Sequence, residues 1–157
     1  MQRTSVLTSK VPPFVQLLNP LMAGMVRLGV PTGADMRLLT VRGRASGRDR
    51  TTPVAVFDYD GGLYLFGTFG DTQWTRNLRV AGEAVLTRGR RGVKVVATEL
   101  TVEEAAPVLK GALEHYLSTP MRPFLQRYYA PSADGRIEDY RDVAAHHPVF
   151  RLRDPGI

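Results

Sequence analysis

Short apolar runs separated by polar and glycine-containing segments predict a series of β-strands in the middle of the chain. Residues 36–41 and 51–57 are short apolar runs rich in β-branched side chains, as strands are. The Asp- and Gly-rich residues 58–62 are typical of a turn, and a third apolar run follows at residues 63–69. We therefore expect the second and third runs to pair as a hairpin.

A second hairpin is predicted further along the chain. Apolar runs at residues 83–87 and 93–100 flank Arg88–Gly92, a turn-forming segment with three arginines. A basic tip of this kind is typical of a solvated hairpin turn. One more strand is expected at residues 147–153, close to the end of the chain.

Between and after these strands the pattern changes to the period of an α-helix. Over residues 71–82 the larger side chains recur at i, i+3 and i+4. Asp71 or Thr72 can cap this helix, and Gly82 can end it.

A capping box predicts the start of the second helix. In Thr101 to Glu104 each side chain can accept a hydrogen bond from the backbone N–H of the other residue, and the helix should run to about Leu117. Another helical stretch is expected around residues 121–130, followed by a polar segment.

This order of elements predicts the fold class. Strands joined mostly by hairpins imply an antiparallel sheet, and we expect it to close, or nearly close, into a β-barrel with helices outside. The fold is then of the α+β class. With 157 residues the chain is long enough for a hydrophobic core, so we expect a single domain over residues 1–157.

The most apolar stretch of the chain lies within residues 1–31. Gln16, Asn19, Pro20 and Arg27 interrupt it, which argues against a signal peptide and against a membrane-spanning helix. We expect a peripheral amphipathic helix there. It packs on the domain, or it lies on a membrane or covers a substrate pocket.

Composition and charge narrow the class of partner. The net charge is +6, which favours anionic partners such as nucleic acid, an acidic membrane face or a phosphorylated small molecule. The chain has no cysteine, which excludes disulfides and thiolate metal sites and is compatible with a cytoplasmic location. His146 and His147 are adjacent and make a poor metal-binding pair, because neighbours in a strand point to opposite faces. No metal site is expected.

The most distinctive chemistry lies between the first two predicted strands. Four arginines fall within nine residues together with Gly43 and Gly47. These arginines are Arg42, Arg44, Arg48 and Arg50. Taken alone, the segment is either a solvated turn or an anion-binding loop, since glycine lets backbone N–H groups approach a phosphate and arginine matches phosphate or carboxylate bidentately.

The stretch from Leu38 to Thr98 resembles the deazaflavin-dependent nitroreductase and quinone reductase family. The matching residues are Leu38, Leu39, Thr40, Gly43, Arg44, Ser46, Gly47, Arg50, Pro53, Trp74, Asn77 and Leu78. The resemblance implies a split β-barrel related to those of flavin oxidoreductases. It also implies coenzyme F-420, a reduced 8-hydroxy-5-deazaflavin with a ribityl phosphate and an acidic polyglutamyl tail.

The same resemblance implies a set of cofactor-binding residues. They are Arg44, Ser46, Arg50, Thr52, Pro53, Gly67, Thr68, Trp74 and Asn77. The two arginines and the serine would hold the tail, Thr52 and Pro53 would lie near the ring system, and Gly67 with Thr68 would let the ring approach the backbone. The residues alone favour packing for Trp74 and a buried amide, tying helix to backbone, for Asn77.

Two positions depart from the family pattern. Many members carry lysines where this chain has Ala45 and Phe69, so two positive charges near the coenzyme tail are missing. The main hypothesis is a reductase of quinones, nitro compounds or other activated unsaturated acceptors. The alternative is a non-catalytic relative that binds a lipid or another apolar ligand in the barrel.

Other assignments stay open or are disfavoured. A nucleic-acid binder lacks the interleaved aromatic platform that single strands need, so we expect no nucleic-acid partner. No catalytic residue is assigned. Four tyrosines are candidate substrate or proton contacts, with plain packing as the alternative: Tyr116, Tyr128, Tyr129 and Tyr140.

Overall fold

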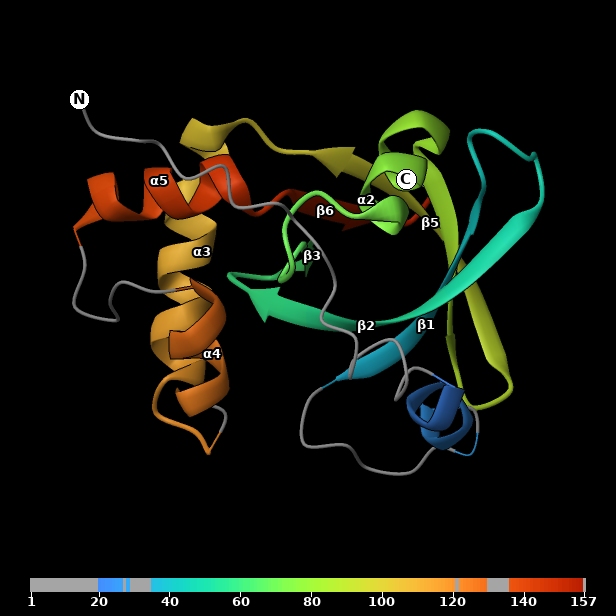
Figure 1. The fold of residues 1–157 in the computed structure, drawn as a ribbon, viewed down its shortest axis with the longest axis horizontal. Helices are drawn as coiled ribbons and strands as arrows, with labels where there is room; N and C mark the ends of the chain where they lie inside the picture. The colour runs from blue at the N-terminus through green and yellow to red at the C-terminus, as the bar shows by residue number, and fades with distance from the viewer. Residues whose placement is uncertain (1–19, 27, 29–34, 121, 130–135, 157) are drawn as a thin grey trace.

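The strands close into a barrel in a computed structural model, which describes residues 20–26, 28, 35–120, 122–129 and 136–156 (Figure 1). They are β1 (Met36–Arg42), β2 (Asp49–Tyr59), β3 (Gly62–Phe66), β4 (Glu83–Arg88), β5 (Arg91–Glu99) and β6 (Val149–Arg153). Around the barrel the order is β1-β2-β3-β6-β5-β4, and every neighbouring pair is antiparallel. The expected α+β fold with a closed antiparallel barrel is confirmed.

Both predicted hairpins are present. The turn between β2 and β3 centres on Asp60 (φ 49°) and Gly61 (φ 73°), the left-handed pair that a two-residue hairpin requires. β3 ends at Phe66, three residues before the predicted end. Gly67 N–H still donates across to the Pro148 carbonyl (2.7 Å), and the backbone then turns away from the sheet, with Gly70 N–H donating to the Gly67 carbonyl (2.9 Å).

Four helices follow the local patterns in the chain. They are α2 (Gln73–Ala81), α3 (Val102–Tyr116), α4 (Arg122–Tyr129) and α5 (Ile137–His146). The capping box of α3 is confirmed, with Thr101 Oγ1 accepting from Glu104 N–H (3.2 Å) and Glu104 Oε2 accepting from Thr101 N–H (2.9 Å). Gly82, at φ 70°, ends α2 by donating to the Leu78 carbonyl.

The start of α2 differs from the prediction. Thr72 occupies the cap position, but its side chain makes no capping hydrogen bond. Asp71 instead accepts from the Thr75 hydroxyl at 2.9 Å. Burial alone would raise the pKa of Asp71, but hydrogen bonds from Thr75, Arg79 and Arg76 outweigh it and lower the pKa. The carboxylate is therefore held charged at the N-terminus of α2, where the helix dipole favours it.

The sequence analysis assigned no helix to the polar segment after residue 130, but residues 137–146 form α5. Tyr140, Val143 and Ala144 lie at the i, i+3, i+4 spacing of one helix face and are buried. They pack with α3 residues such as Ala105 and Leu109 in one hydrophobic cluster. α5 is therefore held by its apolar stripe, although most of its other residues are polar.

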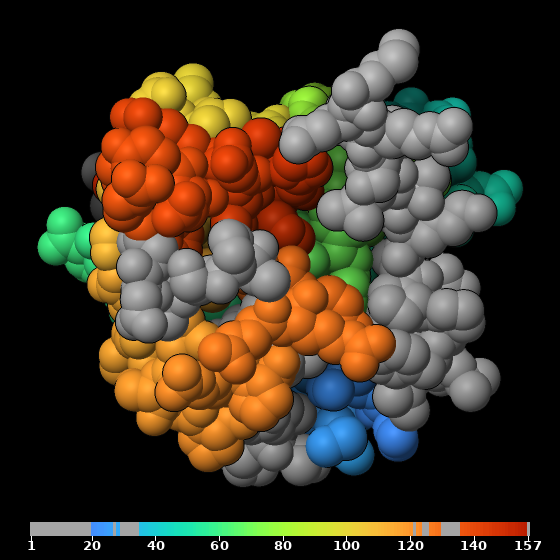
Figure 2. Space-filling view, turned by 60° about the vertical axis from the view of Figure 1, so that its left-hand side comes forward, coloured from blue at the N-terminus to red at the C-terminus, as the bar shows by residue number. Residues whose placement is uncertain are grey.

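Two hydrophobic cores stabilise the molecule. The barrel interior is filled by side chains that include Leu39, Leu65 and Phe150, each 0% exposed, and α2 adds the fully buried Leu78. A second core lies outside the barrel, where α3 and α5 cover Phe57 and other aromatic side chains of β2 and β3. Figure 2 looks onto this helical side of the molecule.

Glycine allows α3 to approach the sheet closely. A Cβ on Gly111 would lie 2.1 Å from the Tyr59 ring, so the end of β2 and the middle of α3 pack directly against each other. The later helices thus cover one outer side of the barrel, while α2 contributes to the interior core.

Part of the N-terminal region is described as a helix. Residues 20–26 are helical, Val26 is 3% exposed, and the Val26 carbonyl accepts from Gly89 N–H (3.2 Å) at the tip of the β4–β5 hairpin. The rest of the N-terminal prediction lies outside the described residues, apart from Leu28. Within the described parts of the chain, no helix has the length and apolarity that crossing a membrane would require.

Candidate functional site

The arginine-rich loop between β1 and β2 is a tight, glycine-dependent turn. Gly43 N–H donates to the Arg48 carbonyl (2.8 Å), and Gly47 N–H donates to the Gly43 carbonyl (2.9 Å). A Cβ on Gly43 would lie 2.8 Å from Ser46 Oγ, and Gly47 has a φ of +67°. Neither position tolerates an ordinary side chain without strain.

Arg44 connects this loop to α2. Its backbone N–H donates to Asn77 Oδ1 (3.2 Å), and its guanidinium donates to the same oxygen (2.7 Å) and to Gln73 Oε1 (3.0 Å). Asn77 is 6% exposed. The interpretation of Asn77 as a buried amide that ties the helix to the backbone is confirmed, and its partner is the loop. Arg44 is thus positioned before any ligand binds.

Most of the positive charge on this loop has no carboxylate beside it, the exception being Asp49, which lies opposite Arg42 in the β1–β2 register. Five arginines elsewhere form ion pairs with Asp or Glu: Arg37, Arg76, Arg79, Arg88 and Arg141. Within the described residues, none of the four loop arginines has such a partner. The loop therefore presents a surplus of cationic donors, which is what an anionic ligand requires.

The remaining residues predicted to hold the tail are placed differently. Ser46 Oγ accepts from Arg48 N–H at 3.2 Å, so the hydroxyl also shapes the turn. Arg50 is exposed at the start of β2, opposite Val41. Both remain on the loop or next to it, at the same end of the barrel as Arg44.

Thr52 and Pro53 cannot both present side chains to one ring. They are consecutive residues of β2, so their side chains point to opposite faces of the sheet. Thr52 shares its face with the buried Val54. Their proximity to the ring system stays a prediction.

Gly67 is explained by packing. A Cβ at this position would lie 2.8 Å from Pro148 Cδ and 2.9 Å from the Gly70 carbonyl oxygen. The space beside Gly67 is thus occupied by Pro148, just before β6. The predicted role of Gly67 in letting a ring approach the backbone is not needed to account for the glycine.

Thr68 belongs to a buried polar cluster. Its hydroxyl lies 2.6 Å from the hydroxyl of Tyr129, which is 5% exposed. Burial raises the pKa of Tyr129 well above its usual range, and the hydrogen bond with Thr68 only partly opposes this. The phenol therefore stays protonated at neutral pH.

His147 completes this cluster. Its ring centroid lies 4.6 Å from that of Tyr129, and its Nδ1 lies 2.9 Å from the Gly67 carbonyl oxygen. Burial lowers the pKa of His147, so the ring is neutral, and Nδ1 carries the proton because a carbonyl can only accept. The sequence analysis did not assign His147 to the site, because its partner Gly67 is 80 positions away.

Aromatic side chains border the same segment. The Phe69 ring meets the Tyr128 ring edge to face at 5.0 Å, so the position that lacks the family lysine forms an aromatic contact. Trp74 packs against the interior core, with its ring 6.1 Å from that of Phe150. The interpretation of Trp74 as a packing residue is confirmed.

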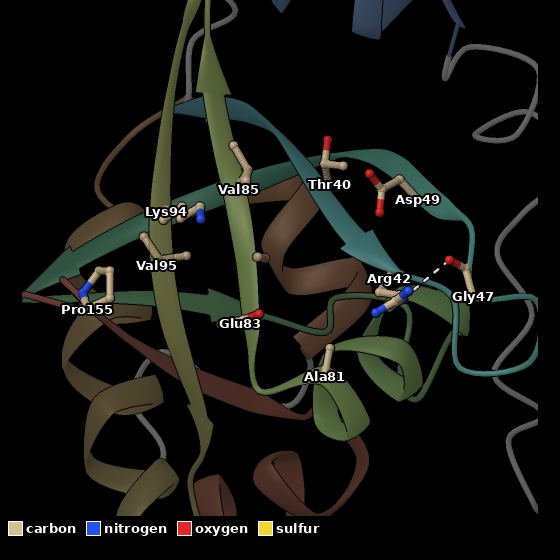
Figure 3. A pocket seen from close by; sticks show the side chains of 11 residues that line it. Thr40, Arg42, Gly47, Asp49, Ala81, Glu83, Val85, Lys94, Val95 and Pro155 are labelled. Atoms are coloured by element: carbon tan, nitrogen blue, oxygen red, sulfur yellow. Dashed lines mark hydrogen bonds between the residues drawn. The ribbon is translucent and has the colours of Figure 1, made fainter.

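A cavity adjoins the arginine loop but does not include the predicted cofactor-binding residues. It measures about 660 Å³ and lies on the outer face of β1, β4 and β5, where Arg42 Nε donates to the Gly47 carbonyl at 3.3 Å (Figure 3). Its charged lining is mixed, with Arg42 and Lys94 facing Asp49 and Glu83. None of the nine residues in the predicted cofactor-binding set lines it. The candidate site is therefore the arginine loop with α2 and the segment after β3.

The closed antiparallel barrel agrees with the split-barrel fold that the sequence resemblance implied. Residues 22–118 match the family model of the F420H(2)-dependent quinone reductases, so the chain belongs to this family. Membership implies the deazaflavin coenzyme F-420 as cofactor and deazaflavin-dependent reduction as the class of reaction, as the sequence resemblance predicted.

Solved structures with the same architecture are only distantly related in sequence. A candidate 5-nitroimidazole antibiotic resistance protein of Bacteroides thetaiotaomicron is 13% identical, with a TM-score of 0.50 over 84% of this chain and 77% of its own. An F420-H2 dependent reductase, FDR-A, is 22% identical, with a TM-score of 0.48 over 76% of this chain and 94% of its own. No curated protein sequence matches significantly.

Proposed function

We propose that this protein binds reduced coenzyme F-420 at the arginine loop and reduces a quinone or a similar activated, apolar acceptor. The proposal is supported by the arginine loop, which is held in place by α2 and whose arginines form no ion pair within the described residues, in a chain that belongs to this family. Arg44 is preorganised by Asn77, and Arg50 is exposed beside it. These residues fit a coenzyme whose phosphate and tail carry several negative charges.

The roles of the protein's own residues follow from their chemistry. When bound, the reduced deazaflavin supplies a hydride for the acceptor. Arg44 and Arg50 hold the anionic tail and so orient the coenzyme. The contact between Phe69 and Tyr128 offers an aromatic surface for a flat, apolar acceptor. Thr68 and Tyr129 hold exchangeable protons next to it, and neither hydroxyl is ionised at neutral pH.

The alternative function, binding of a lipid inside the barrel, has less support. Leu39, Leu65 and Phe150 fill the barrel interior and are 0% exposed, so an acyl chain would have to displace them. Solvent extraction of the purified protein tests this directly. Stoichiometric acyl chains in the extract would favour the lipid-binding alternative.

Coenzyme titration tests the proposed site. Arg50→Ala should raise the dissociation constant about tenfold, because a charge-assisted hydrogen bond contributes about 1.5–3 kcal/mol and solvent screening reduces this at an exposed position. Arg48→Ala is the matched control, since the family pattern does not fix this arginine, and it should change the constant by less than about threefold.

A variant that should bind the coenzyme more tightly provides a second test of the same site. Ala45→Lys restores a cation beside Arg44 and should tighten binding several-fold, more at low salt than at high salt. If neither wild type nor Ala45→Lys binds the coenzyme at low salt, the proposal fails.

A further inference from the structure

A second cluster of cations lies at and near the tip of the β4–β5 hairpin. Arg88, Arg90 and Arg91 lie at the tip, Lys94 follows on β5, and all four are exposed. Arg88 has a long contact with Asp35 (3.8 Å), a carboxylate that also pairs with Arg37 at 2.9 Å. Within the described residues the other three cations of this cluster have no ion-pair partner.

The acidic residues of this hairpin are at its other end. Glu83 begins β4 and Glu99 ends β5, where Glu99 pairs with Arg79. Within the hairpin itself, the charged residues nearest the tip are therefore all positive. The pairing of Leu38 with Thr87 places the tip at the opposite end of β1 from the arginine loop. It is a separate surface from the candidate coenzyme site.

An apolar helix adjoins the basic tip. Residues 20–26 contain no charged side chain, and their last residue, Val26, accepts a hydrogen bond from Gly89 at the tip. Leu21 is 63% exposed, Leu28 is 82% exposed, and Val93 on β5 is 47% exposed. Figure 1 shows this short blue helix lying beside the hairpin tip.

We propose that residues 20–26, Leu28 and the β4–β5 tip form a docking surface for a bilayer that contains anionic lipid. Exposed aliphatic side chains next to arginines match the two layers of a membrane surface: the aliphatic groups enter the acyl boundary and the cations meet the headgroups. A nucleic acid would bind the same cations, but the surface has no aromatic side chain on which bases could stack.

Such docking would bring the barrel to the lipid bilayer, in which apolar acceptors dissolve. It does not depend on coenzyme binding, because the docking residues lie outside the candidate site. Loss of docking and loss of coenzyme binding are therefore distinguishable by experiment.

Vesicle sedimentation with the full-length protein tests the proposal. We expect binding to phosphatidylcholine vesicles that contain phosphatidylglycerol at about one part in three, weak binding to phosphatidylcholine alone, and weakening by salt. The double variant Arg90→Gln, Arg91→Gln should lower the partition coefficient roughly 25-fold, about fivefold for each cation. Leu28→Ser should lower it roughly tenfold through the lost apolar contact.

The control variant removes two positive charges from a different surface of the protein. Arg151→Gln, Arg153→Gln changes two exposed arginines of β6 and should alter the partition coefficient less than about twofold if the tip is responsible. All variants should keep the wild-type melting temperature and coenzyme affinity. Equal loss in both double variants, absence of binding to anionic vesicles, or binding of an oligonucleotide in place of vesicles would overturn the proposal.

Discussion

Asn77 connects the stability of the barrel to its capacity for binding an anion, and Asn77→Ala measures both effects. The side-chain oxygen accepts from the backbone and the guanidinium of Arg44, and the residue is 6% exposed. A charge-assisted hydrogen bond contributes about 1.5–3 kcal/mol, and we take the lower end because water can replace the partner of the exposed guanidinium. A loss of about 2 kcal/mol lowers the melting temperature by about 4–8 °C in a domain of this size.

The same variant should weaken coenzyme binding. Arg44 would no longer be positioned, and ordering such a side chain on binding costs about 0.5–1.5 kcal/mol. The dissociation constant should therefore rise about two- to tenfold. Thermal unfolding and fluorescence titration of the coenzyme provide the two measurements.

Two further variants separate the contributions. Gln73→Ala removes only the exposed contact with Arg44 and should change the melting temperature by less than about 2 °C. Asn77→Asp keeps the acceptor but neutralises Arg44, so stability should be nearly retained while coenzyme binding weakens. If Asn77→Ala leaves both quantities unchanged, or if Asn77→Asp binds the coenzyme as tightly as wild type, the role assigned to Asn77 is wrong.

Two more predictions concern packing and pH. Gly111→Ala should destabilise the protein by about 1–2 kcal/mol, because the new methyl group displaces the Tyr59 ring. In a Tyr59→Ala background the same change should stabilise the protein by about 0.5–1 kcal/mol, because only the higher helix propensity of alanine remains. Urea unfolding of the four proteins measures both effects, and an effect of the same sign in both backgrounds would contradict the prediction. Burial lowers the pKa of His147 in the folded protein. Below about pH 6.5 the unfolded state therefore binds more protons at this residue than the folded state does. The resulting stabilisation is complete above this pH and is lost as the pH falls toward the folded-state pKa. His147→Gln should flatten this slope in urea unfolding, and a slope unchanged from wild type in this variant would exclude His147 as its source.

Local interactions made much of the fold predictable from the sequence. The β2–β3 turn depends on Asp60 and Gly61, and the start of α3 depends on a hydrogen-bonded pair three residues apart, Thr101 and Glu104. α5 was missed although Tyr140 and Val143 already had helical spacing, because its polar residues dominated the pattern.

The components of the site were also visible in the sequence, but not their contacts. The motif that contains Arg44 and the one that contains Asn77 are each recognisable, whereas the hydrogen bond between them spans 33 positions. The contact between Thr68 and Tyr129 spans 61 positions, and nothing in either local pattern indicates it.

By itself, the sequence determined the strands, the hairpins, the start of α3 and the cationic loop, because turn geometry, capping and hydrophobic period act between residues that are close along the chain. Only the tertiary structure decided that β6 inserts between β3 and β5 to close the barrel, that Asn77 holds Arg44, and that α4 brings Tyr129 to Thr68. These contacts join distant segments, and they form because folding must bury apolar side chains and pair the polar groups buried with them.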